Sequence, residues 1–252
     1  MRSTIFALVL REIRGKFGAN RLGGFWFIFE PLAHILGLLA IFVFLKGHAS
    51  NVPAQLKFLI NGVVPFILFK NIALTGMESV RANKGLFAYR QIKPFDIILA
   101  RALVELLLML FIYTALIFFV SFVFEFNAFP IDPISWAFTF FIGILFSVAS
   151  AIIFCIATRN YPESAALIRL MYFPLYFISG VIFPIALMPR KLMEFLLWNP
   201  YLHLIELLRA DSIDRYVPHS GVNIMYPLYC TLIITAFALI LYRNNRYRLI
   251  AG

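Results

Sequence analysis

The sequence predicts an all-α membrane protein, and three observations carry that prediction. Of the 252 residues, 62% are hydrophobic and 13% are charged, whereas a soluble globular domain is about half apolar and about a quarter charged. There are 29 phenylalanines, an unusual load for a surface in contact with water. Apolar stretches long enough to cross a bilayer recur along the chain. We therefore expect one transmembrane bundle over residues 1–252, with no room for a second large domain.

Residues 1–21 are expected to form an amphipathic helix at the membrane interface. Ile5, Val9, Ile13 and Phe17 recur every four residues, while the arginines fall on another face. Such a helix meets anionic lipid headgroups with its arginines. The alternative is a helix that precedes the first span and only sets the topology.

Six segments are expected to span the membrane, because each holds about 20 predominantly apolar residues. Two of the six are weaker, since the first carries Glu30 and His34 and the second carries Lys70. In chain order the spans are 25–45, 58–77, 106–124, 134–157, 170–187 and 222–242. Spans 1–2 thus fall within 25–77, spans 3–5 within 97–187 and span 6 within 222–243.

Basic residues fix the expected orientation, because they gather on the cytoplasmic side of a membrane protein. With both termini inside, the outer loops hold six: Lys46, Lys57, Arg190, Lys191, Arg209 and Arg215. The inner segments hold fifteen: Arg2, Arg11, Arg14, Lys16, Arg21, Arg81, Lys84, Arg90, Lys93, Arg101, Arg159, Arg169, Arg243, Arg246 and Arg248. We therefore expect both termini in the cytoplasm, with residues 244–252 as a cytoplasmic tail. The net charge of +10 has the same explanation, so we expect no nucleic-acid partner.

The inner segment 78–96 combines charge with exposed apolar side chains. Leu86, Phe87 and Tyr89 lie among basic residues, and exposed apolar groups with a charged rim indicate a docking surface. Pro94 ends the segment, because the residue before a proline leaves helical geometry. The alternative is an ordinary basic loop that only connects two spans.

The outer segment 188–221 is expected to hold two short helices, 191–198 and 201–210. They meet at Asn199-Pro200, a helix cap followed by proline at the first helical position. Both are too short and too polar to span, so we expect a re-entrant hairpin buried against protein. Pro174 and Pro184 in the preceding span indicate a broken or kinked helix.

Motifs for catalysis or metal binding are absent from the sequence. The only Gly-Lys pair, Gly15-Lys16, precedes Phe17, so the chain has no phosphate-binding loop of the P-loop type. There is no H-E-x-x-H and no G-x-S-x-G, and the four histidines never pair at ligand spacing. We therefore expect no catalytic residue, metal ligand or cofactor on this chain.

Ionisable and aromatic residues within the expected spans are the positive functional signal. A lysine at the bilayer centre costs about 2.5–3.5 kcal/mol on insertion scales, so Lys70 should face protein or water. Two pairs four residues apart, Glu30 with His34 and Arg101 with Glu105, share helix faces and either satisfy each other or line a polar path. Tyr172 and Tyr176, one turn apart near Arg169, are candidates for a sugar-stacking lumen. Packing is the alternative for both tyrosines.

Several stretches resemble a known family over nearly the whole chain and in the right order. The resemblance is to capsular polysaccharide export permeases, within the ABC-2 type exporters. It is carried by R-E-I-R-G-K-F-G-A-N-R-L-G-G-F-W (11–26), F-E-P-L-A-H (29–34), A-N-K-G-L-F-A-Y-R-Q-I-K-P-F-D (82–96), R-A-L-V-E (101–105), Y-F-I-S-G-V-I-F-P (176–184) and L-L-W-N-P-Y-L-H-L-I-E-L-L-R (196–209).

The resemblance implies an architecture and a set of partners. A homodimer of six-span subunits sits in the bacterial inner membrane, and each subunit docks a separate cytoplasmic ATPase that holds ATP and magnesium. The cargo is a lipid-linked acidic polysaccharide, passed on to a periplasmic adaptor and an outer-membrane channel. The N-terminal helix flanks the opening for the lipid-linked chain, and the hairpin caps the outer side.

The same resemblance assigns residues to roles. ATPase coupling falls to Glu78, Arg81, Lys84, Leu86, Phe87, Tyr89, Arg90 and Lys93. For the substrate path the charge pattern is the guide: scattered positive charge suits an acidic polymer that must slide, which indicates Arg14, Lys16, Arg21, Lys70, Arg101 and Arg169. Stacking on sugars indicates Tyr172 and Tyr176. The outer hairpin is marked by Trp198, Asn199, Pro200 and Tyr201. The alternatives are an O-antigen or other ABC-2 permease, a membrane-integral lipid-linked transferase, and a passive channel.

Overall fold

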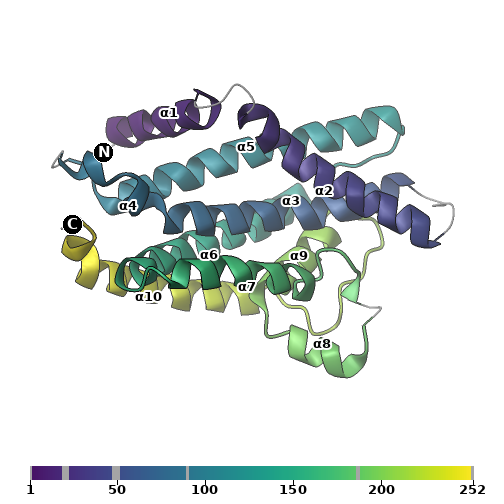
Figure 1. Ribbon diagram of the computed structural model, residues 1–252. Helices are drawn as coiled ribbons and strands as arrows, with labels where there is room; N and C mark the ends of the chain where they lie inside the picture. The colour runs from purple at the N-terminus through teal and green to yellow at the C-terminus, as the bar shows by residue number, and fades with distance from the viewer. Residues whose placement is uncertain (1, 19–22, 47–51, 89–90, 186–187, 251–252) are drawn as a thin grey trace.

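The structure, a computed structural model, is all-α, as predicted (Figure 1). It describes residues 2–18, 23–46, 52–88, 91–185 and 188–250, and no strand occurs in these ranges. The elements are α1 (Arg2–Gly18), α2 (Gly23–Lys46), α3 (Val52–Met77), α4 (Ser79–Ala82), the 3-10 turn η1 (Lys84–Ala88), α5 (Pro94–Val123), α6 (Pro133–Asn160), α7 (Ser164–Ile178), α8 (Arg190–Leu196), α9 (Pro200–Ala210) and α10 (Met225–Ile250).

Helix α3 is the centre of the bundle. It packs against α5, α6, α2 and α9, and 72% of its most apolar window is buried, compared with 17% for α10. Phe66 and Phe69 of α3 are both buried and contact the ring of Tyr201 on α9. The short helix α9 is therefore part of the core and not a surface appendage.

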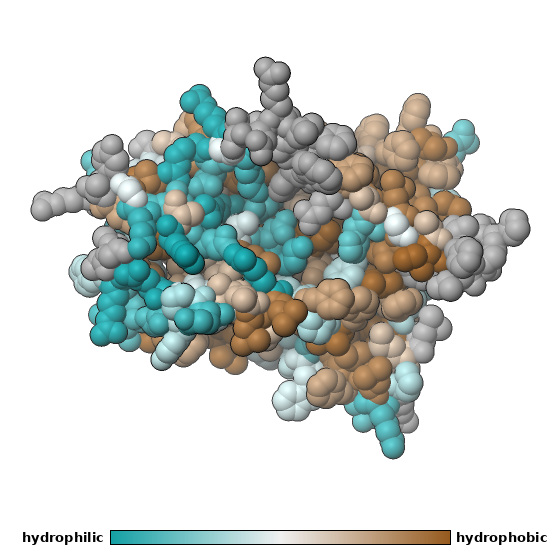
Figure 2. All heavy atoms as spheres, viewed as in Figure 1, coloured by the Kyte–Doolittle hydropathy of each residue, from teal (hydrophilic) through white to brown (hydrophobic). Residues whose placement is uncertain are grey.

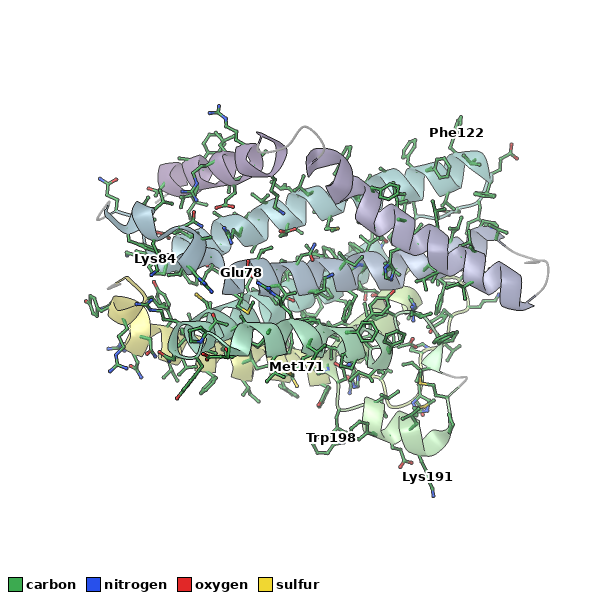
Figure 3. All side chains as sticks on the ribbon, viewed as in Figure 1. Glu78, Lys84, Phe122, Met171, Lys191 and Trp198 are labelled. Carbon is green, nitrogen blue, oxygen red and sulfur yellow. The ribbon has the colours of Figure 1, made fainter. Side chains whose placement is uncertain are left out.

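Four of the described helices are long and apolar enough to cross a membrane: α3, α5, α6 and α10. Their outer faces carry exposed large apolar side chains such as Phe122, which is 81% exposed and points away from the bundle (Figure 3). Met171 on α7 is exposed as well. An apolar exterior of this kind suits contact with lipid.

Helix α7 departs from the predicted fifth span. It covers Ser164–Ile178, 15 residues, where the sequence predicted 170–187. The chain leaves the helix just before Gly180, whose φ of +67° is a left-handed conformation that glycine adopts readily. The expected break is present, and it lies at Gly180, between the two prolines that suggested it.

Prolines and polar caps set several helix starts. Pro94, Pro133 and Pro200 each stand in the first turn, where a missing N–H costs nothing. The Asn199 side chain accepts a hydrogen bond from the Tyr201 amide at 3.0 Å. The predicted cap at Asn199-Pro200 is therefore confirmed.

Several helices extend beyond the predicted membrane spans. Helix α3 begins at Val52 and α5 at Pro94, so both extend beyond the apolar windows. The predicted tail 244–252 is largely the last two turns of α10, which runs to Ile250. Charged residues continue these helices past the apolar segment, which a search for apolar runs misses.

The two ends of the bundle differ in character. One end, here called the basic end, holds the chain termini, α4 and η1, and the other, the hairpin end, holds α8 and α9 (Figure 1). On the face shown in Figure 2, hydrophilic residues gather over the basic end, while hydrophobic residues predominate toward the hairpin end.

Candidate functional site

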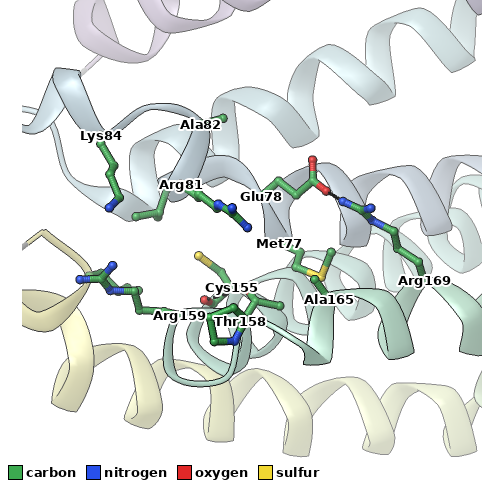
Figure 4. Close-up of a pocket in the computed structure, with 13 residues that line it drawn as sticks. Met77, Glu78, Arg81, Ala82, Lys84, Cys155, Thr158, Arg159, Ala165 and Arg169 are labelled. Atoms are coloured by element: carbon green, nitrogen blue, oxygen red, sulfur yellow. Dashed lines mark hydrogen bonds and ion pairs between the residues drawn. The ribbon is translucent and has the colours of Figure 1, made fainter. Parts of the chain in front are cut away.

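The first candidate site is a cavity of about 640 Å³ at the basic end, here called the basic cavity (Figure 4). Four basic side chains line it: Arg81, Lys84, Arg159 and Arg169. They come from the α4–η1 segment, the end of α6 and α7. Among the described residues, Glu78 is the one carboxylate in the lining. A hollow with this excess of positive charge attracts anions.

One ion pair bridges the basic cavity. The Arg169 guanidinium contacts the Glu78 carboxylate (Figure 4), and their side chains are 56% and 45% exposed. Exposed pairs of this kind contribute about 0–1 kcal/mol. Arg169 can therefore exchange Glu78 for another anion at small cost.

The second candidate site, here called the apolar cavity, measures about 620 Å³ and lies between α2, α3 and α7. Lys70 and Arg169 bring charge to it, and His34 hydrogen-bonds the Tyr176 hydroxyl at 2.6 Å. The rest of the lining is mostly apolar: Leu38, Ile41, Phe66, Ile67, Leu74, Phe173, Phe177, Ile182 and Phe183. Arg169 lines both cavities, so the two are neighbours.

Four of the residues predicted for the substrate path meet in the apolar cavity. Lys70, Arg169, Tyr172 and Tyr176 all line it. Tyr172 is only 5% exposed, and its hydroxyl lies 3.5 Å from that of Tyr201. Most of the Tyr172 ring therefore packs in the protein interior, in line with the packing alternative. The Tyr176 hydroxyl hydrogen-bonds His34. Pairing with Glu30 was one of two alternatives for His34, and the Glu30 side chain lies outside the described ones.

The other predicted path residues lie elsewhere. Lys16 of α1 contacts the Glu105 carboxylate at 2.5 Å, and Arg101 lies 3.4 Å from Glu12. Arg101 also donates to the Thr75 carbonyl at 2.9 Å. Of the two alternatives for Arg101 and Glu105, the structure does not show mutual pairing, because each pairs with a residue of α1. Arg14 is exposed on α1, and Arg21 lies outside the described residues.

These contacts form what we call the α1 latch, in which α1 lies parallel to the start of α5. Leu8 packs with Ile97 and Ala100, and the Glu12–Arg101 and Lys16–Glu105 pairs follow along both helices. The latch face of α1 is thus Leu8, Glu12 and Lys16, one turn apart. Val9, one of the four apolar residues that recur every four positions in this helix, packs on the same cluster.

The predicted coupling residues divide between two settings. Glu78, Arg81 and Lys84 line the basic cavity, and Lys93 is exposed at the start of α5. Leu86 and Phe87, which the sequence placed on an exposed docking surface, are half-buried against the Leu8 and Ile97 cluster. Tyr89 and Arg90 lie outside the described residues.

The hairpin end holds a buried polar group that the sequence did not single out, here called the hairpin knot. Arg209 is fully buried and donates to the carbonyls of Gly180 (2.7 Å) and Val181 (2.6 Å) and to Glu206 (3.2 Å). The Tyr216 hydroxyl donates to the same carboxylate at 2.9 Å, and burial, with Glu206 beside it, raises the pKa of that hydroxyl. Arg209 thus ties α9 to the carbonyls at the break after α7.

A second buried hub lies next to the hairpin knot. The side-chain oxygen of Asn61 accepts hydrogen bonds from Tyr113 (2.8 Å), Trp136 (3.3 Å) and Ser212 (2.8 Å). The sequence signal for it was Asn61 itself, one of the polar residues in an apolar span that also holds Lys70 and Asn71. For the knot, the signal was Glu206 and Arg209 three residues apart on a short helix.

The hairpin residues named from the sequence differ in how far they are buried in the protein. Asn199 and Tyr201 are buried, and the Asn199 amide donates to Ser179 at 2.8 Å. Trp198 is 80% exposed and points outward from the hairpin (Figure 3). Within the described ranges, no group of three or more His, Cys, Asp or Glu side chains lies close enough to hold a metal ion.

Comparisons with known proteins match most of the chain. The family model of the ABC-2 type transporter matches residues 3–211. The chain is 37% identical over 245 residues to the polysialic acid transport protein KpsM of Escherichia coli, covering 96% of this chain and 93% of that protein. It is 25% identical to the capsule polysaccharide export inner-membrane protein CtrC of Neisseria meningitidis, over 94% and 89% of the two chains. It is 23% identical to the capsule polysaccharide export inner-membrane protein BexB of Haemophilus influenzae, over 84% of this chain and 81% of that protein.

Proposed function

The chain belongs to the ABC-2 type transporter family, and we propose that it is the membrane subunit of an exporter of lipid-linked, acidic capsular polysaccharide. The observation that carries the proposal is the 37% identity over 96% of the chain to a polysialic acid transport protein. In this proposal the polymer moves from the cytoplasm to the periplasm, and a separate cytoplasmic ATPase, holding ATP and magnesium, supplies the energy.

The charge distribution supports an acidic cargo. A sliding polyanion needs fixed positive charge without a tight multidentate site, because it must leave each position after reaching it. Arg81, Arg159 and Arg169 supply that charge at the basic end, and Lys70 carries it into the bundle.

The proposed topology has six spans with the basic end in the cytoplasm. The four long apolar helices supply four spans. Helix α2, at 24 residues, is about 36 Å long, enough to cross a hydrocarbon core of about 30 Å. The remaining span, fifth in chain order, is α7. It is about 22 Å long and needs the segment after Gly180 to complete the crossing. Helices α8 and α9 then form the re-entrant hairpin against the core, and α1 lies at the cytoplasmic membrane surface.

The proposed assembly is a homodimer with one ATPase chain per subunit. The segment from Glu78 to Lys93 is the proposed ATPase contact, since it lies at the basic end and reaches the cavity. Export to the cell surface then requires a periplasmic adaptor and an outer-membrane channel.

The test is reconstitution of this chain with its ATPase in proteoliposomes. We expect ATP turnover to rise when acidic glycolipid is added, and polymer to become protected inside the vesicles only with ATP. A neutral glycolipid of equal length is the control. Polymer movement without ATP would indicate a channel, and a changed glycolipid would indicate a transferase; either contradicts the proposal.

The coupling role needs variants that spare the packing. Phe87 is half-buried against α1 and α5, so Phe87→Asp would disturb the fold as well as docking. Lys84→Glu with Lys93→Glu changes two exposed side chains instead. We expect the double variant to lose ATPase binding, while Arg246→Glu on α10 retains it. Unchanged ATPase binding would refute this contact.

A further inference from the structure

The basic cavity and the apolar cavity together have the shape of a site for an amphiphile. They share Arg169, so the two cavities lie next to each other. The basic cavity carries four cationic side chains against Glu78, and the apolar cavity is lined mostly by aromatic and aliphatic side chains. A ligand that fills both must join an anionic group to a hydrocarbon chain.

One face of α7 runs along both compartments. Ala165 and Arg169 line the basic cavity, and Arg169, Tyr172, Phe173, Tyr176 and Phe177 line the apolar cavity. These positions recur every three or four residues, so they share one helix face. Helix α3 repeats the pattern, with Met77 at the basic cavity and Leu74, Lys70, Ile67 and Phe66 at the apolar cavity. A ligand would therefore lie lengthwise between the two helices.

The depth of Arg169 suits a phosphate. Arg169 is five residues after the start of α7, which places it about 7.5 Å along the helix axis. If α7 begins at the membrane surface, this depth is the boundary between the headgroups and the hydrocarbon core, which are about 5–7 Å and about 30 Å thick. Tyr176 and Phe177 lie two turns deeper, at the depth of acyl chains.

We propose that the two cavities bind a phospholipid with an anionic phosphate headgroup, whose phosphate competes with Glu78 for Arg169. Guanidinium groups bind phosphate oxygens through paired hydrogen bonds, and Arg81 and Arg159 lie in the same cavity as Arg169. The acyl chains lie against Phe173, Phe177 and Phe183. The inference rests on the proposed membrane placement of the bundle.

Lipid binding at this site would affect the segment proposed to contact the ATPase. Glu78 stands between α3 and α4, directly before the segment proposed to contact the ATPase. When phosphate takes Arg169, Glu78 is released from α7. The lipid thus links the state of α7 to the position of α4.

The test measures lipid binding to the full chain alone, by native mass spectrometry in detergent with phosphatidylglycerol or phosphatidylcholine added. We expect tighter binding of phosphatidylglycerol. Removing one cation near a membrane costs about 1 kcal/mol, so Arg169→Gln and Arg159→Gln should each weaken phosphatidylglycerol binding about fivefold. Arg246→Gln, an exposed arginine at the same end but outside both cavities, is the control and should bind like wild type.

The variant Glu78→Gln tests the proposal by the direction in which lipid binding changes. Because it removes the competitor for Arg169, it should strengthen phosphatidylglycerol binding, which a damaged fold would not do. Equal affinity for both lipids, or weaker binding by Glu78→Gln, would overturn the inference. So would arginine variants that lose ATPase binding while lipid binding is unchanged, since that result would assign the cavity to the partner protein.

The source of the phosphate is decided by the lipid that copurifies. Mass analysis of chain from cells with and without the capsular glycolipid distinguishes a membrane phospholipid from the anchor of the cargo. A phospholipid that copurifies from both kinds of cell supports the inference, whereas the cargo anchor alone would assign the two cavities to the export path and overturn it. Because lipid binding needs neither ATP nor polymer, its failure is distinct from a failure of export. A chain that exports polymer but shows no preference for anionic lipid refutes this inference alone.

Discussion

Arg209 at the hairpin end and Arg169 at the basic end are the same residue type in opposite situations. Arg209 is fully buried, and Gly180, Val181 and Glu206 all accept hydrogen bonds from it. Arg169 is 56% exposed and faces Glu78 in a cavity with three further cations. A buried charge is tolerated only when fully paired, whereas a half-exposed one exchanges partners readily. The hairpin end is therefore built to stay fixed, and the basic end to bind and release.

The largest expected effect comes from breaking the hairpin knot. Arg209→Leu leaves the Glu206 carboxylate buried without its cation and frees two carbonyls, so we expect a loss of about 3–5 kcal/mol in the free energy of unfolding. Thermal unfolding in detergent measures it. Arg215→Leu, at a side chain that is 93% exposed, is the matched control. Similar stability of the two variants would contradict the proposed rigidity of this end.

A second change at the same end tests the Asn61 hub. Asn61→Leu removes the acceptor for Tyr113, Trp136 and Ser212, and each buried unpaired donor costs about 1–3 kcal/mol. Because some donors will find other partners, we expect about 2–3 kcal/mol, measured as above. The control is Asn244→Leu on the exposed surface of α10. A loss below about 0.5 kcal/mol would show that the hub is dispensable.

The α1 latch lies between the two extremes, because Lys16 is 29% exposed while Glu105 is 2% exposed. Glu105→Gln removes a charge-assisted contact and should cost about 1.5–3 kcal/mol, with faster proteolysis within α1. Exchange of the pair, Lys16→Glu with Glu105→Lys, should recover part of the loss. Additive losses in the double variant would mean that the two residues do not interact.

The smallest effect on stability should come from the cavity itself. Arg169→Gln breaks an exposed ion pair and should change the free energy of unfolding by less than about 1 kcal/mol. The same variant should reduce glycolipid-stimulated ATP turnover several-fold. A large destabilisation, or full turnover, would remove the contrast between the two ends.

The sequence alone identified many residues of the candidate site, but it did not show what each of them contacts. Lys70, Arg169 and Tyr176 were named from their charge or position in apolar spans, and the structure brings them into one cavity. Lys16 and Arg101 were named on the same grounds, but they lie in the α1 latch, where they pair with Glu105 and Glu12. A count of charges shows where cations gather, but it does not show which acidic side chain each of them meets.

The sequence by itself determined the properties that depend on neighbouring residues. Apolar length predicted membrane-spanning helices, and Asn199-Pro200 predicted the start of α9, because hydrophobicity and capping act within a few residues. The tertiary structure alone decided what depends on residues far apart in the chain. Lys16 meets Glu105 across 89 residues, and Arg209 reaches the carbonyls of Gly180 and Val181. A charge in an apolar bundle must find its partner wherever helix packing places one, and only the folded chain specifies that place.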